Sequence, residues 1–130
     1  MHFIKLLLIS LVAFIPLDLI WLGYVGRPIY VKYLGHHMRE NPDWQAAIIF
    51  YFIFLAGLVF FVVQPSLNDS FSKMLTKAAF FGLITYGTYE LTNRAVINDW
   101  PWPIVWIDIC WGIVLCMLVA SASWYFGKKF

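Results

Sequence analysis

Residues 78–96 read AAFFGLITYGTYELTNRAV and change character halfway along. The stretch 78–84 is apolar, whereas 85–94 carries threonine, tyrosine, glutamate, asparagine and arginine side chains. A helix surrounded by lipid does not tolerate such groups on every side, because hydrocarbon offers them no hydrogen-bond partner. The second half must face protein or water, so we expect an all-α bundle in which other helices surround this one.

The composition is that of an integral membrane protein. Of the 130 residues, 62% are hydrophobic and 12% are charged, and the charged share is about half of that in soluble domains. This length accommodates a single transmembrane domain, residues 1–130, without a separate soluble module. The net charge of +2 is small and scattered, so the bilayer is the expected partner and nucleic acid is not.

Apolar runs and the breaks between them predict four transmembrane helices in an antiparallel bundle. Pro65 and the turn residues after it separate the second span from the third, and Asn98 to Pro103 separate the third from the fourth. Pro16 lies inside the first span and lacks an amide hydrogen, so we expect a kink near it. The predicted spans are 3–24, 44–64, 71–96 and 102–126.

The distribution of basic residues predicts the orientation. Four spans place both termini on one side, which carries five lysines against three basic residues on the other when Arg94, inside the third span, is set aside. Basic residues favour the cytoplasmic side, so both termini are predicted to be cytoplasmic. The lysines are Lys5, Lys73, Lys77, Lys128 and Lys129, and the opposite residues are Arg27, Lys32 and Arg39.

Asp18, Glu90 and Asp108 stand inside three different predicted spans. Each lies about six residues, or roughly 9 Å of helix, from the outer end of its span, so one depth in the outer half is expected for all three. Ionisable groups inside a span are costly and mark a functional site by default. The competing interpretation is structural, in which each acid only caps a helix or bonds a tyrosine or threonine.

The neighbours of the acids extend this candidate site. Arg94 follows Glu90 by four residues and is expected to pair with it, which leaves Asp18 and Asp108 needing a proton or a cation. The spacing Asp-x-x-Trp occurs at Asp18 and again at Asp108, although chance explains it equally well among seven tryptophans. The candidate ligand- or proton-binding residues are Asp18, Trp21, Tyr86, Tyr89, Glu90, Asn93, Arg94, Asp108 and Trp111.

Other chemistries lack support in the sequence. His36, His37 and Glu40 resemble metal ligands, but adjacent histidines point apart on a helix and no further ligands stand at a diagnostic spacing. Neither a nucleophile elbow nor a phosphate-binding glycine loop is present. We therefore expect no metal and no cofactor.

Several segments together resemble a known family. They are LDLIWLG at 17–23, YGTYELTN at 86–93, WP at 102–103 and DICWG at 108–112. This ordered set is similar to the small four-span bacterial membrane proteins called domain of unknown function 2177. The resemblance implies a bacterial inner membrane location and supplies no activity. Aspartate is usual in that family at the Glu90 position and an aliphatic residue at the Arg94 position, so the arginine is a local feature.

The leading hypothesis is a membrane protein that binds, and by extension transports, a small ligand, lipid headgroup, cation or proton at an acidic pocket in the outer half. A second hypothesis is a membrane enzyme that acts on a lipophilic substrate with the same carboxylates as acid and base, and it is the less favoured one. A third is an accessory subunit of a membrane complex. Small residues suited to close helix contacts, within one bundle or in a homo-oligomer, are Gly57, Gly82, Gly87 and Gly112.

Overall fold

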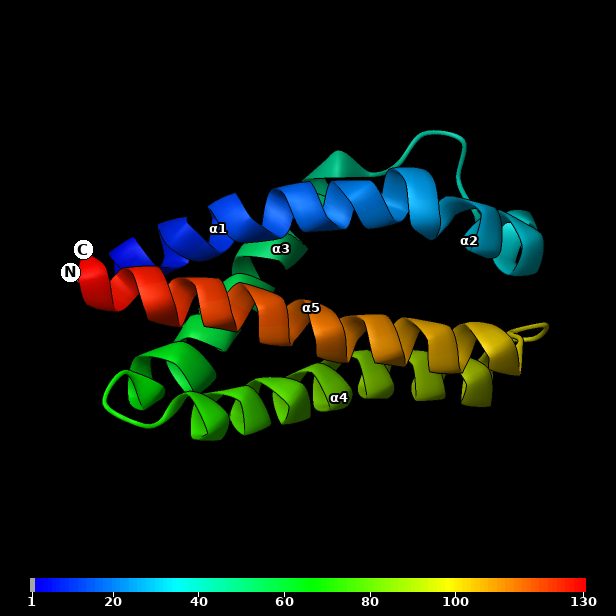
Figure 1. Cartoon of the computed structure of the whole chain (residues 1–130). Coiled ribbons are helices and arrows are strands. Elements are labelled where there is room, and N and C mark those ends of the chain that lie inside the picture. Colours follow the sequence, from blue (N-terminus) through cyan, green and yellow to red (C-terminus); the bar gives the residue numbers. More distant parts are fainter. Residues whose placement is uncertain (1) are drawn as a thin grey trace.

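Helices and short turns make up the computed structural model, which describes residues 2–130 and contains no β-strand over that range. Four long helices run back and forth, so that both termini lie at the same end of the molecule (Figure 1). The α-helices are α1 (His2–Ile20), α2 (Arg27–Leu34), α3 (Trp44–Leu58), α4 (Phe71–Val96) and α5 (Trp102–Lys129). Two π-helical turns, η1 (Trp21–Val25) and η3 (Val59–Val63), extend α1 and α3, and 3₁₀ turns form η2 (Gly35–His37) and η4 (Gln64–Ser66).

Within residues 2–130, three helical segments are long and apolar enough to cross a membrane: His2–Val25, Trp44–Ser66 and Trp102–Lys129. The remaining long helix, α4, has 26 residues, but its polar second half makes it less apolar than these three segments. The predicted ends of all four helices lie within one turn of the observed ends, and 71–96 coincides with α4.

The connection after the first span contains a helix that the sequence analysis did not predict. Arg27–Leu34 forms α2, with Pro28 in its first turn, where the missing amide costs no hydrogen bond. Leu34 is buried against the start of α5, so α2 is anchored to the bundle. The predicted spans leave residues 25–43 outside any helix, because hydrophobic periodicity does not reveal the apolar contact of Leu34.

The first span departs from α-helical geometry at η1, after Pro16. The chain is helical on both sides of Pro16, and the departure from α-helical geometry begins after Ile20. There the Gly26 amide donates to the Trp21 carbonyl at 2.5 Å. A Cβ at Gly26 would lie 2.8 Å from the Trp21 Nε1, so only glycine lets this indole lie over the turn.

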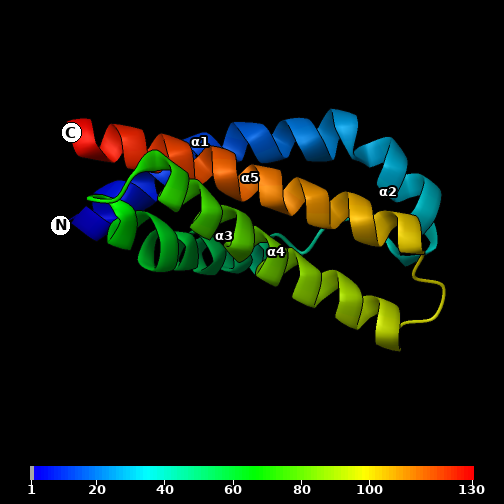
Figure 2. The same ribbon diagram turned by 60° about the horizontal axis from the view of Figure 1, so that its bottom comes forward.

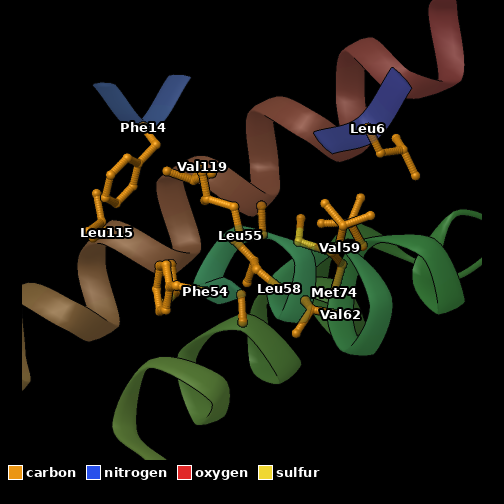
Figure 3. Packing of buried hydrophobic residues seen from close by; sticks show 14 residues of the cluster. Leu6, Phe14, Phe54, Leu55, Leu58, Val59, Val62, Met74, Leu115 and Val119 are labelled. Carbon is orange, nitrogen blue, oxygen red and sulfur yellow. The ribbon is translucent and has the colours of Figure 1, made fainter. Parts of the chain in front are cut away.

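The larger hydrophobic core lies toward the termini and joins α1, α3 with η3, α4 and α5. In Figure 3, Phe14 of α1, Phe54 of α3 and Leu115 of α5 lie near one another in this core. We call it the terminal-side cluster. Its buried members are Leu6, Phe14, Phe54, Leu55, Leu58, Val59, Val62, Val63, Met74, Ala78, Leu115, Cys116, Val119 and Ala120.

A smaller apolar cluster lies at the opposite end, where α2 meets the start of α5. We call it the loop-side cluster, and its buried members are Leu34, Trp100, Ile104, Val105 and Ile109. Along α5, Asp108 stands beside Ile109 of this cluster and before Leu115 of the terminal-side cluster. The buried polar residues include three acids, Asp18, Glu90 and Asp108.

Glycine allows α4 and α5 to approach closely, and the two helices lie side by side in Figures 1 and 2. A Cβ at Gly82 would lie 2.6 Å from the Gly112 carbonyl oxygen, and a Cβ at Gly112 would overlap the Tyr86 ring. Both positions exclude a side chain, so they fix the distance between the helices that carry Glu90 and Asp108. By contrast, a Cβ at Gly87 would meet no atom within 4 Å.

Candidate functional site

The three carboxyl groups are buried in one layer, contributed by three helices. Asp18 on α1, Glu90 on α4 and Asp108 on α5 are 8%, 1% and 7% exposed. Asp18 and Asp108 line one cleft, and the side chain of Glu90 interacts with that of Asp108. We call these three residues the acid layer.

Asp108 is held by a chain of hydrogen bonds from the first span and α2. The Tyr30 hydroxyl donates to Asp108 Oδ1 at 2.5 Å, and the Trp21 Nε1 donates to the same hydroxyl at 2.8 Å. Tyr30 lies beyond the span His2–Val25. Burial, followed by the negative charge of Asp108, raises the pKa of Tyr30 above its ordinary value of 10.0. The phenol therefore keeps its proton and remains a donor at neutral pH.

Asp18 is bound by α3. The Tyr51 hydroxyl donates to Asp18 Oδ2 at 3.2 Å, and the Tyr51 ring packs edge-on against Phe14 with centroids 5.1 Å apart. A carboxylate has two oxygen acceptors, and Tyr51 occupies only one of them. Asp18 can therefore accept a further hydrogen bond.

The partner of Glu90 differs from the one expected. Trp100, in the turn between α4 and α5, donates its Nε1 to Glu90 Oε1 at 2.8 Å. Arg94 instead donates to the Trp100 carbonyl oxygen at 2.7 Å and lies over the Trp102 ring, so the expected Glu90–Arg94 pair was wrong. The guanidinium orders the turn, which in turn positions the indole that binds Glu90.

The two Asp-x-x-Trp segments face each other across the bundle. The rings of Trp21 and Trp111 are stacked, with centroids 4.5 Å apart and an angle of 7° between their planes. Both tryptophans line a cleft of about 220 Å³ together with Asp18 and Asp108. The repeated spacing thus places an aromatic wall beside each of these two acids.

A second, more apolar cleft of about 360 Å³ adjoins the first. Tyr86 and Tyr89 line it with Asp108, and Tyr86 also lines the smaller cleft. Asn93 lines neither cleft; it interacts with the Tyr89 hydroxyl through its side chain, and its carbonyl oxygen caps α4. The residues around the larger cleft are Phe50, Phe54, Thr85, Tyr86, Tyr89 and Asp108.

Basic side chains do not neutralise the acid layer. Within residues 2–130 the ion pairs are Arg39 with Asp43 and Lys77 with Asp69, both away from the layer. Over the same range, no three His, Cys, Asp or Glu side chains are arranged to hold a metal ion. The acid layer is therefore lined by aromatic rings, and the hydrogen bonds that its carboxyl groups accept come from neutral side chains.

The donors to the acids are the functional residues that sequence reasoning missed. Tyr30 lies outside the predicted spans, and neither Tyr51 nor Trp100 was among the candidate residues, although only 6% of Trp100 is exposed. The usable signal was chemical, since a buried carboxyl group needs donors and tyrosine and tryptophan supply them from apolar surroundings.

Comparison with known proteins identifies one family. A family model described as "Predicted membrane protein (DUF2177)" matches residues 3–125, nearly the whole chain. No curated protein and no solved structure matches.

Proposed function

The chain belongs to the family of predicted membrane proteins described as DUF2177, and from that premise we propose that its acid layer binds the cationic group of a small ligand inside the membrane. The observation that carries the proposal is the burial of three carboxyl groups, from three helices, without a basic partner. Unpaired acids at membrane depth are rare and face a site or a partner.

The proposal includes four spans. The 26 residues of α4 measure about 39 Å, which exceeds a hydrocarbon core of about 30 Å. Its polar half lies beside α5, where Glu90 is 1% exposed, so protein rather than lipid surrounds that acid. We place the termini in the cytoplasm of a bacterial cell and the acid layer in the outer half of its inner membrane, following the excess of lysines at the terminal end.

Binding is favoured over conduction. A conducting route along the bundle axis would have to pass the terminal-side cluster and the loop-side cluster, whose members are at most 8% exposed. The acids themselves come from a single chain, so one copy is sufficient to build the pocket.

Native mass spectrometry of protein extracted in mild detergent tests the proposal. We expect the wild type to retain a small cationic molecule and Asp108→Asn to lose it. The matched control is Asp69→Asn, which removes an equal charge from the turn at the terminal end. Wild-type protein that carries no such molecule, and whose unfolding temperature is unchanged by millimolar organic ammonium ions, would contradict the proposal.

A further inference from the structure

The acid layer is reached from the side of the bundle rather than from its ends. The loop-side cluster covers it toward the outer end, and the terminal-side cluster covers it toward the termini. The segment that begins with α3 contacts α4 chiefly through η3, at the terminal end. This leaves the larger cleft between α3 and α4 at the level of the acid layer.

The mouth of this cleft is apolar and faces outward. Phe50 on α3 and Tyr89 on α4 are 51% and 55% exposed, and the neighbouring Ile53 and Ile84 are also exposed. In a membrane these side chains meet acyl chains. An occupant that extends through the mouth must therefore be apolar where it leaves the protein.

The inner end of the cleft can bind two kinds of polar group on a ligand. Asp18 and Asp108 attract a cation or a hydrogen-bond donor. The Trp111 indole N–H, which belongs to the same cleft, is buried and lacks a hydrogen-bond partner within residues 2–130. A buried donor without an acceptor is uncommon in proteins and is explained by a missing partner. The head of the ligand should therefore also carry an acceptor oxygen.

The two clefts share three lining residues, Phe50, Tyr86 and Asp108, and so adjoin each other beside this acid. We infer that the ligand is a single-chain amphiphile whose head combines an amine with a hydroxyl oxygen, the head lying beside Asp18, Asp108 and Trp111 and the alkyl chain leaving between α3 and α4. This inference rests on the proposed function, since it names the ligand class of the same site.

Saturable binding to protein in phosphatidylcholine nanodiscs tests the inference, with tryptophan fluorescence as the readout. The probes are ethanolamine, 2-aminohexan-1-ol, 2-aminododecan-1-ol (called aminododecanol below), dodecylamine and dodecanol. We expect aminododecanol to bind at least about tenfold more tightly than ethanolamine, because the cleft removes several methylene groups from water. Dodecylamine should bind more weakly than aminododecanol, and dodecanol should not compete.

A pair of threonine variants separates the cleft from simple partitioning into lipid. Thr85 lines the cleft and Thr76 is exposed on the same helix, and both hydroxyls bond the carbonyl four residues earlier. Thr85→Phe should weaken aminododecanol binding by about tenfold or more and ethanolamine binding by less, and its tryptophan emission maximum reports whether the variant is folded. Thr76→Phe should leave both affinities as in the wild type.

The outcomes distinguish the two proposals. If ethanolamine binds as tightly as aminododecanol, the amphiphile inference is wrong and the acidic binding site stands. The same conclusion follows if the affinities of Thr85→Phe for the amines of different chain length equal those of the wild type. If no amine binds saturably, and Asp108→Asn behaves like the wild type, both proposals are overturned.

Discussion

Replacing Tyr30 with phenylalanine tests whether α2 secures the acid layer. The substitution keeps the ring and removes one hydroxyl, which accepts from Trp21 and donates to Asp108. A hydrogen bond to a charged group contributes roughly 1.5–3 kcal/mol, and a buried partner left unpaired costs a comparable amount. We therefore expect Tyr30→Phe to lower the free energy of unfolding by roughly 1.5–3 kcal/mol.

Tyr33→Phe is the matched control. Tyr33 belongs to the same helix, but its contacts are made by its ring, which packs against the loop-side cluster and lies under the Lys32 ammonium. Its free energy of unfolding should change by less than about 0.5 kcal/mol. Denaturant titration in detergent micelles measures both variants, with tryptophan fluorescence as the signal because the stacked Trp21 and Trp111 separate on unfolding. Equal effects of the two substitutions would refute the hydrogen-bonded role of Tyr30.

Three further predictions concern glycines and pH. Gly82→Ala should destabilise the protein by about 1–3 kcal/mol because its Cβ meets the backbone of α5, whereas Gly87→Ala should stabilise it by about 0.5–1 kcal/mol. Thermal unfolding should therefore show a lower unfolding temperature for the first variant and a higher one for the second, and shifts of the same sign would contradict the packing. Gly26→Ala should displace the Trp21 indole, and an unchanged tryptophan emission maximum would argue against that. Because the pKa of Tyr30 is raised, the unfolded state loses this proton first, so stability should fall as pH rises above 10.0; the fall should be smaller in Tyr30→Phe, and identical pH profiles would disprove the linkage.

Periodicity and composition predicted the long helices well. Their ends follow from local signals, such as Ser70, whose hydroxyl accepts from the Lys73 amide at the start of α4. Counting along each helix predicts a common depth for the three acids, which stays a prediction. Counting does not give the direction in which a side chain points, so the contacts among the acids emerge only from the packed bundle.

The contacts that the sequence analysis missed are tertiary. Arg94 stands at the right spacing to pair with Glu90, yet the turn after α4 offers it a carbonyl oxygen and an indole ring. The left-handed backbone of Asp99, with φ of 62°, sits just before Trp100, whose indole reaches back to Glu90. Helical spacing alone does not reveal such competition between a neighbour on the same helix and a partner across a turn.

The π-helical turn η1 sets the rotational position of everything that follows it. A π turn contains one more residue than the α-helical turn it replaces. If the same residues, Trp21–Val25, formed an ordinary α-helix, everything after them would be rotated by about 100°. Asp18 would keep its place while Tyr30 would turn away from Asp108, so the extra residue taken up by this turn is what directs α2 toward the acids.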